Sequence, residues 1–322
     1  MNDLWMGHVE RIKYSFLALV SSLSLFLAAV LIPIAGTLLL PLVPQPLLRL
    51  GVRWGKATTL GATVVLIPLL YGLGGRELVL GYLIVASMGV FLLFSLSPER
   101  SLEKIVLAAA TGFFVLGSAT LLALAGSLAQ LQDVIRNTLG QNLHLALKVY
   151  DKAGVSPEST EFLRKQWPQL VEFVLQISPA LAFSGCAVAV LLNLLLLVRR
   201  LPHARGSLLP AGDPKEWKSP ELLVWGFIGA GFCALVFEDG WIKMLSLNLF
   251  LVSLVFYFFQ GLAIIAYYFH HKNVPVFLRG LGYALIFLEQ VIMLIVVGLG
   301  LFDLWGDFRR LNKKDFHPTH AS

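Results

Sequence analysis

Long apolar runs recur along this 322-residue chain, and they constrain its fold more strongly than any other feature. A helix needs about 20 apolar residues to cross the hydrocarbon core of a bilayer, which is roughly 30 Å thick. With 57% hydrophobic and only 14% charged residues, the chain lies outside the usual range of soluble globular proteins. We therefore expect an all-α polytopic bundle of about eight membrane helices, forming a single integral membrane domain over residues 1–322. The runs are 14–40, 57–73, 78–97, 105–129, 173–198, 222–237, 244–269 and 276–302.

The connection between the first two runs, residues 33–55, carries four prolines: Pro33, Pro41, Pro44 and Pro46. Proline cannot donate a backbone hydrogen bond and disfavours helix at the preceding residue, so one regular helix cannot run through this segment. Irregular backbone beside the hydrocarbon core survives only where protein or a water-filled cavity satisfies its polar groups. Two interpretations stay open. The segment forms one wall of a ligand-access site, or it is a stiff connector at the membrane surface.

Residues 130–170, between the fourth and fifth runs, predict an amphipathic helical hairpin rather than a span. Apolar residues recur at helical spacing from Leu139 to Tyr150, and Pro157 stands in the first turn of a second predicted helix. A hairpin of this kind lies on the membrane surface or docks a partner, and the two look alike in sequence. Residues 199–219 are rich in proline, glycine and charge, which predicts an irregular linker.

A few polar side chains interrupt the apolar runs and are the candidates for a site. Glu289 lies near the middle of the last run, where an ionised acid costs about 2.5 to 3.5 kcal/mol and should face protein or water. Tyr257 and Gln260 belong to a polar stripe on the seventh run, of a kind that joins helices or lines a cavity. We predict that Tyr257, Gln260 and Glu289 line a ligand site, with Arg49 or Arg53 at its mouth to hold an anionic group.

The sequence carries no Walker phosphate loop, no G-x-S-x-G and no H-E-x-x-H motif. Its two cysteines, Cys186 and Cys233, and the pair His270 and His271 lack the further ligands that a metal site needs. We therefore expect no catalytic residue, no metal and no cofactor, and interpret the chain as non-enzymatic. The net charge is +6, but the basic residues lie at the ends of apolar runs, which favours the lipid bilayer over nucleic acid as partner.

Four stretches together carry a resemblance that spans nearly the whole chain. They are LLRLGVRWGK, AGVSPESTEFLRKQWPQL, WKSPELLVWGFIGAG and NLFLVSLVFYFFQGLAIIAYY. In these stretches the chain resembles the YybS-like family of predicted membrane proteins. That family is of unknown function and is similar in turn to the substrate-binding S-components of energy-coupling-factor vitamin transporters.

The resemblance implies a small-molecule-binding transporter component of the bacterial cytoplasmic (inner) membrane, working with a transmembrane coupling protein and paired ATPases. In such subunits the first connection covers the ligand, which agrees with the first interpretation of residues 33–55. S-components typically have six helices, whereas this chain is expected to have about eight and a hairpin. The alternative hypothesis is a non-transporting scaffold that recruits a partner through the hairpin. The sequence does not identify the ligand.

Overall fold

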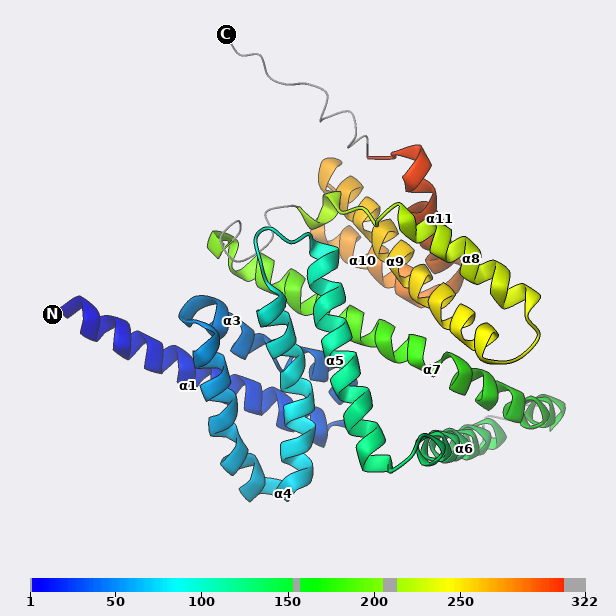
Figure 1. The fold of residues 1–322 in the computed structure, drawn as a ribbon, viewed down its shortest axis with the longest axis horizontal. Coiled ribbons are helices and arrows are strands. Elements are labelled where there is room, and N and C mark those ends of the chain that lie inside the picture. Colours follow the sequence, from blue (N-terminus) through cyan, green and yellow to red (C-terminus); the bar gives the residue numbers. More distant parts are fainter. Residues whose placement is uncertain (1, 153–156, 205–212, 310–322) are drawn as a thin grey trace, which may run out of the picture. The chain divides into compact units, whose positions relative to one another are not determined.

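The computed structural model describes residues 2–152, 157–204 and 213–309, and all regular elements in these ranges are helical (Figure 1). The expected all-α class is therefore confirmed. The α-helices are α1 (Asn2–Leu31), α2 (Pro33–Leu39), α3 (Gln45–Trp54), α4 (Lys56–Ser95), α5 (Leu102–Ala125), α6 (Leu128–Lys152), α7 (Pro157–Arg200), α8 (Leu222–Val236), α9 (Trp241–His271), α10 (Val276–Leu288) and α11 (Gln290–Gly306). Short 3₁₀ turns are η1 (Leu40–Leu42), η2 (Pro202–Ala204) and η3 (Pro214–Glu216).

The expected count of about eight membrane helices is not confirmed. Within the described residues, five helices are long and apolar enough to span a bilayer, or six if the bent pair α10–α11 is one span. The difference has three sources. Two expected runs, 57–73 and 78–97, are counted together as α4, although the helix is broken between them at Gly74 and Gly75. In addition, α8 has only 15 residues, and the run 276–302 is broken.

The middle of α4 departs from helical geometry at two consecutive glycines. Gly74 has φ −162° and ψ 24°, and Gly75 has φ 70° and ψ −159°. Glycine is suited to the positive φ at Gly75 because it has no Cβ to clash with the backbone. Figure 1 shows the ribbon of α4 turning back on itself near its label, so its two apolar halves run in opposite directions.

The last apolar run is broken at Glu289, where α10 and α11 meet at an angle of 102°. Glu289 has extended backbone angles, φ −106° and ψ 111°, and neither proline nor glycine lies at the break. Its N–H still donates to the carbonyl of Leu285, and its carbonyl still accepts from Met293. The change of direction is therefore concentrated at this one acidic residue.

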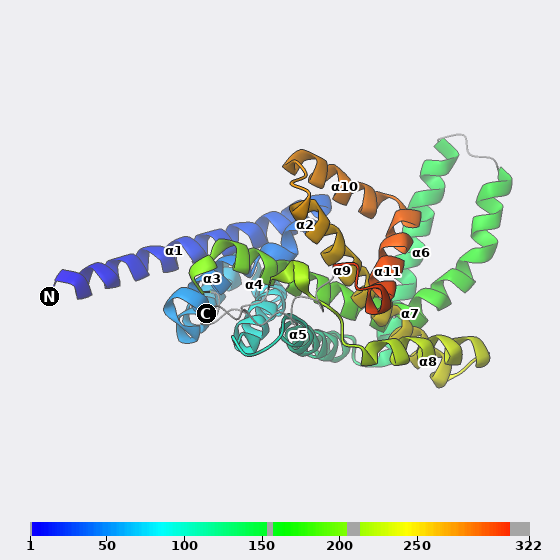
Figure 2. The same ribbon diagram turned by 90° about the horizontal axis from the view of Figure 1, so that it is seen from above.

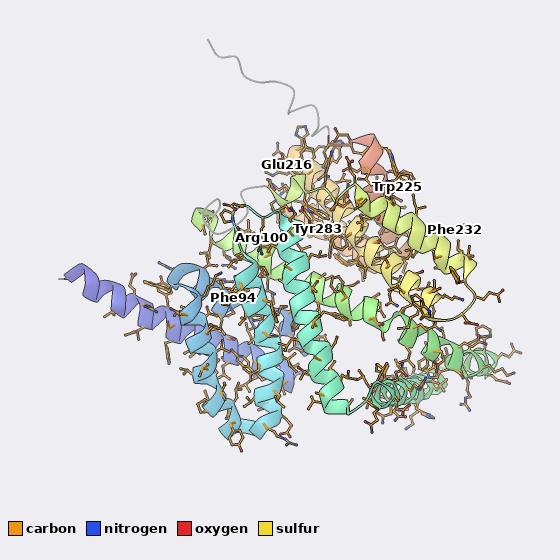
Figure 3. The ribbon with its side chains drawn as sticks, viewed as in Figure 1. Phe94, Arg100, Glu216, Trp225, Phe232 and Tyr283 are labelled. Carbon is orange, nitrogen blue, oxygen red and sulfur yellow. The ribbon has the colours of Figure 1, made fainter. Side chains whose placement is uncertain are left out.

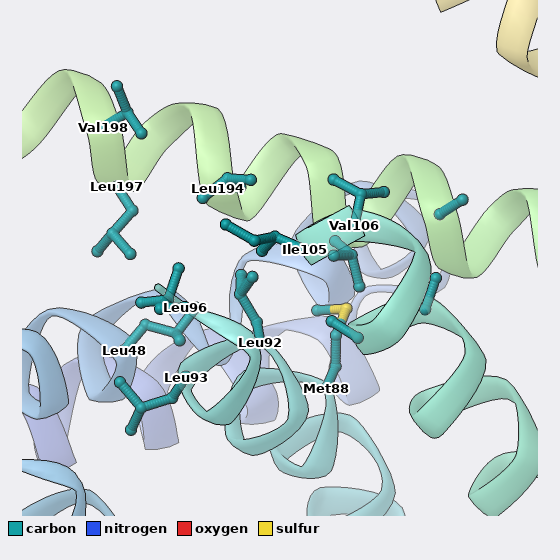
Figure 4. Packing of buried hydrophobic residues seen from close by; sticks show 14 residues of the cluster. Leu48, Met88, Leu92, Leu93, Leu96, Ile105, Val106, Leu194, Leu197 and Val198 are labelled. Atoms are coloured by element: carbon teal, nitrogen blue, oxygen red, sulfur yellow. The ribbon is translucent and has the colours of Figure 1, made fainter. Parts of the chain in front are cut away.

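The chain folds into two compact units, and α5, α7 and α9 each contribute to both. The first comprises Met1–Phe114, Phe183–Glu221 and Val255–Ser322, and the second comprises Val115–Ala182 and Leu222–Leu254. In the first unit a core joins α3, α4, α5 and the C-terminal part of α7, as Figure 4 shows. Leu92, Ile105 and Leu194 have no exposed surface in this core.

In the second unit, α6 and the first part of α7 run antiparallel (Figure 2). They are joined by the guanidinium of Arg136, whose Nε donates to Glu172 Oε1 at 3.0 Å. Their inner faces bury Leu143 on α6 and Leu175 on α7. The same unit holds α8, from which Trp225 and Phe232 project with most of their surface exposed, as lipid-facing aromatics do (Figure 3).

Asn248 of α9 repairs a backbone break in α7 within the second unit. Its Oδ1 accepts from the N–H of Ala180 at 2.7 Å, and its Nδ2 donates to the carbonyl of Gln176 at 2.8 Å. In an uninterrupted helix these two groups would bond to each other. They stand apart beside Pro179, so the carboxamide fills the opened hydrogen bond at this proline.

In the first unit, α9 and α11 approach each other so closely that only glycine fits at the crossing. A Cβ at Gly300 would overlap the carbonyl oxygen of Tyr257 and lie 2.8 Å from the amide nitrogen of Gly261. A Cβ at Gly261 would lie 2.7 Å from Val296 Cγ1. Small residues of this kind let membrane helices associate through backbone contact, in the absence of a hydrophobic driving force between them.

The close crossing of α9 and α11 predicts that alanine substitutions at two glycines of α11 differ sharply in their effect on stability. Gly300→Ala should destabilise the purified protein by about 2 kcal/mol or more, because the added methyl overlaps backbone that cannot move aside. Gly298→Ala is the matched control, since nothing lies within 4 Å of a Cβ there. Thermal unfolding in detergent measures both. Equal midpoints for the two variants would show that α9 and α11 do not cross at Gly300.

Candidate functional site

The proline-rich connection, residues 33–55, is mostly helical, so the expected irregular backbone is limited to the breaks between short helices. α2 begins at Pro33, and Pro41 and Pro46 lie in the first turns of η1 and α3. Proline is tolerated in a first turn because the N–H that it lacks would have no partner within the helix. Each proline thus starts a new helix, and no single helix runs through the segment.

The carbonyl groups along this connection accept hydrogen bonds from side chains of three neighbouring helices. The carbonyl of Pro41 accepts from Asn193 Nδ2 of α7 at 2.6 Å. Ser22 of α1 donates to the carbonyl of residue 43 at 2.9 Å, and Thr59 of α4 donates to that of residue 47 at 2.9 Å. The connection is therefore tied to α1, α4 and α7, and these bonds place α3 beside α1.

A cavity of about 590 Å³ lies between α1, α3 and the C-terminal end of α7, all within the first unit. Its volume falls within the range of small-molecule sites, about 300 to 1,000 Å³. Gln45, Arg49 and Arg53 line it from α3, where their spacing of four residues places them on one face of the helix. Its apolar lining includes Leu17, Ala18, Leu25, Leu42, Leu50 and Leu196.

The lining of this cavity is cationic. It includes the side chains of Arg49, Arg53 and Arg200, and none of its lining residues is acidic. Burial lowers the pKa of Arg49, and the positive charge of Arg200 lowers it further. The guanidinium of Arg53 stacks over the ring of Tyr14, with 4.3 Å between its central carbon and the ring centroid. The arrangement favours an anion, because a negative charge would offset both the burial and the repulsion.

Several buried polar atoms beside the cavity have no hydrogen-bond partner in the described part of the chain. They are both amide atoms of Gln45, the Nε of Arg49 and the Nε1 of Trp54. Gln45 is only 3% exposed, so bulk water does not reach it. Buried polar groups are normally paired, so unpaired ones call for an explanation such as a bound water, ion or ligand.

Of the predicted site residues, the structure places Arg49 and Arg53 on this cavity. Tyr257, Gln260 and Glu289 are not among its lining residues, so the predicted set does not come together around it. Gln45, Trp54 and Arg200 were missed. The spacing of Gln45, Arg49 and Arg53 by four residues is a signal that the sequence contained. Arg200 is about 150 positions away, and only the fold brings it near.

Gln260 is fully buried in a second polar cluster of the first unit, where its hydrogen bonds are satisfied. Its Nε2 donates to Asp303 Oδ2 at 3.1 Å. Its Oε1 accepts from the backbone N–H of Ser219 at 3.1 Å and also from the Ser219 hydroxyl. The side chain thus links α9, α11 and the segment before α8.

The centre of this second cluster is an ion pair without solvent exposure. Arg309 Nη2 lies 2.8 Å from Asp303 Oδ2, and both side chains have 0% exposure. Arg309 Nη1 also donates to the carbonyls of Lys215 at 2.7 Å and Trp217 at 2.9 Å. Because each charge has its counter-charge and further hydrogen bonds, this cluster has the character of a structural clasp.

The remaining predicted residues lie elsewhere. Tyr257 has no exposed surface, and its carbonyl faces Gly300 at the helix crossing. Glu289 is exposed at the α10–α11 break and makes no side-chain cap to α11. In the described residues, no group of three or more histidine, cysteine, aspartate or glutamate side chains could hold a metal ion.

Taken together, several apolar helices, a crossing built on glycines and polar groups paired between helices define a polytopic helical membrane protein. Residues 20–304 match the family described as "Predicted membrane protein (DUF2232)", and the chain belongs to this family. No curated protein matches the chain. No solved structure matches it either.

The buried ion pair predicts a large loss of stability when one partner is removed. Asp303→Asn should cost about 3 to 5 kcal/mol, because the guanidinium of Arg309 would remain buried without its counter-charge. Asp239→Asn, at an exposed position between α8 and α9, is the matched control. The double variant Asp303→Asn/Arg309→Gln should lose less than the sum of the single variants. Asp303→Asn unfolding at the same temperature as Asp239→Asn would exclude the clasp.

Proposed function

We propose that this membrane protein binds a small anionic molecule in the cavity between α1, α3 and the end of α7, as the substrate-binding component of a transporter. The observation that carries the proposal is the cavity itself. It combines three arginines, no acidic lining residue and a buried Gln45 whose amide is unpaired. Arginine is well suited to this role because its planar fork binds carboxylates and phosphates through two hydrogen bonds at once.

The resemblance to S-components supports a transport role. In those subunits the first connection covers the ligand, and here the first connection supplies α3, which forms one wall of the cavity. On this proposal the protein resides in a bacterial inner membrane, is not an enzyme, and works with a transmembrane coupling protein and paired ATPases. Isolation from native membranes under mild conditions, followed by mass spectrometry of stoichiometric partners, tests the assembly.

Ligand binding is tested on the purified protein with a panel of vitamins, nucleobases and lipids, by thermal shift and native mass spectrometry. Arg49→Gln and Arg200→Gln should each weaken binding of an anionic hit by about tenfold or more, since a hydrogen bond to a charged group contributes about 1.5 to 3 kcal/mol. Arg76→Gln is the control, because Arg76 is exposed on α4 and does not line the cavity. A hit that binds all three variants equally would contradict the proposed site.

A second candidate function, a scaffold, is favoured by one specific observation on the hairpin of α6 and α7. Val134, Leu145 and Val149 lie on one face of α6 and are 57%, 60% and 61% exposed. Their face is not the one that packs on α7, where Leu143 and Leu147 are buried. An exposed apolar face of this kind suits a partner helix or the bilayer surface.

Photo-crosslinking from Leu145 and Val149 in native membranes separates these occupants. A scaffold predicts a discrete protein adduct at both positions, and its loss when Val134 is replaced by Asp. Adducts with lipid alone would contradict the scaffold and leave the hairpin as a membrane-surface element.

A further inference from the structure

The cavity between α1, α3 and the end of α7 is elongated along α1. From α1 it is lined by Tyr14, Ala18, Ser21 and Leu25, residues that recur at helical spacing on one side of the helix. Tyr14 and Leu25 are separated by 11 positions, which corresponds to roughly 16 Å at 1.5 Å per residue. A ligand that fills this length is an extended molecule rather than a compact one.

The two ends of the cavity differ in polarity, and two contacts between α1 and the first connection fix their order. Ser22 bonds the carbonyl of Val43, just before α3 begins, and Arg53 near the end of α3 stacks on Tyr14. The start of α3 therefore lies near residue 22 of α1, and its end lies near residue 14, so the two helices run in opposite directions. Leu25 lies beyond the start of α3, so the apolar end of the cavity is opposite to its arginine-rich end.

The arginine-rich end can accommodate more than one negative charge, and two of its three arginines, Arg53 and Arg200, are exposed. Arg49 is half-buried and close enough to Arg200 for their like charges to interact, and Arg53 is the third cation of the lining. A carboxylate carries one charge on two oxygens. A phosphomonoester carries about −1.5 to −2 at neutral pH and three strong acceptor oxygens. It matches three guanidinium groups better, and the indole N–H of Trp54 is a further unpaired donor there.

The unpaired carboxamide of Gln45 adds a requirement of its own. Its Nε2 is a donor and its Oε1 an acceptor, and neither is paired. Both atoms have almost no accessible surface, so the carboxamide must turn toward the cavity to bond a ligand. A phosphate oxygen can then accept from Nε2, and the hydroxyl of a monoprotonated phosphate or of the carbon chain can donate to Oε1. Gln45 precedes Arg49 by one helical turn, so it lies between the arginines and the apolar end of the cavity.

From this order of charges and apolar surface we propose that the ligand is a phosphomonoester carried on a hydrocarbon chain, with its phosphate at Arg49, Arg53 and Arg200 and its chain along α1 toward Leu25. This inference rests on the proposed function, because it names the chemical class of the anion that the same cavity binds. A phosphomonoester on a lipid and a soluble phosphorylated compound share the head group. The hydrocarbon chain distinguishes them.

The test uses the full chain in nanodiscs of phosphatidylcholine, whose own phosphate is a diester, and measures apparent dissociation constants for three probes. These are dodecyl phosphate, lauric acid and inorganic phosphate. Dodecyl phosphate should bind at least about tenfold more tightly than lauric acid, which has the same chain length, because of the additional charge-assisted bonds. It should bind at least about a hundredfold more tightly than inorganic phosphate, because the chain concentrates it in the membrane.

Variants locate the binding of dodecyl phosphate. Arg49→Gln and Arg200→Gln should each raise its dissociation constant at least about tenfold. Arg76→Gln should leave the dissociation constant unchanged. Phosphatidylglycerol at about 20% of the nanodisc lipid should also leave it unchanged, and this tests competition by a bulk anionic diester. Arg200 is exposed at the end of α7, so its substitution keeps the test valid if Arg49→Gln fails to fold.

The alternative outcomes separate this inference from the proposed function. If lauric acid or inorganic phosphate binds as tightly as dodecyl phosphate, and Arg49→Gln still weakens binding, the inference of a phosphomonoester lipid is wrong. The proposed anion site is then retained. Displacement by phosphatidylglycerol overturns it in favour of bulk lipid. Equal binding to Arg49→Gln, Arg200→Gln and Arg76→Gln overturns the inference and the proposed cavity together.

Discussion

The structure depends on hydrogen bonds that satisfy backbone groups in apolar surroundings. Prolines divide the first connection into short helices, and water does not replace a lost backbone partner in such an environment. Asn193, Ser22 and Thr59 donate hydrogen bonds to three carbonyls of this connection, each from a different helix. The second unit obeys the same constraint, since Asn248 closes the backbone gap at Pro179. Polar side chains on these helices thus hold the fold together.

The two polar clusters of the first unit differ in whether their charges and amide groups have partners. In the cluster around Asp303, each of the two charges meets its counter-charge, and Gln260 is bonded on both sides of its amide. Around Arg49 the charges are of one sign, and Gln45 has no partner for either amide atom. Arg309 Nε is unpaired in the described residues, but the charge of Arg309 is balanced by Asp303. A charge-balanced cluster stabilises a single arrangement of helices, whereas a cavity lined by charges of one sign favours a ligand of the opposite charge. This contrast is the physical basis of the functional proposal.

Much of the architecture could be predicted because apolar length and proline chemistry act locally. The helical class and the division of residues 33–55 by prolines follow from neighbouring residues alone. The count of about eight spans is not confirmed, because apolar content alone does not show that α8 is too short to cross a bilayer or that the last run bends. The turn of α4 at Gly74 and Gly75 falls in the gap between two predicted runs, whereas neither proline nor glycine marks the bend at Glu289. The site was predicted in part. Arg49 and Arg53 share a helix face with Gln45, but the partners of Gln260, among them Asp303 and Arg309, are distant in sequence.

The central claim is that α1, α3 and the C-terminal end of α7 line a cavity that an anion completes. A high-resolution electron cryomicroscopy map of the protein, purified from native membranes without added ligand and enlarged with an antibody fragment, examines this directly. The account predicts non-protein density that contacts the guanidinium of Arg49 and the carboxamide of Gln45 and extends along α1. A map in which α3 is closed onto α1, with the amide of Gln45 bonded to protein and no space between the helices, would contradict it.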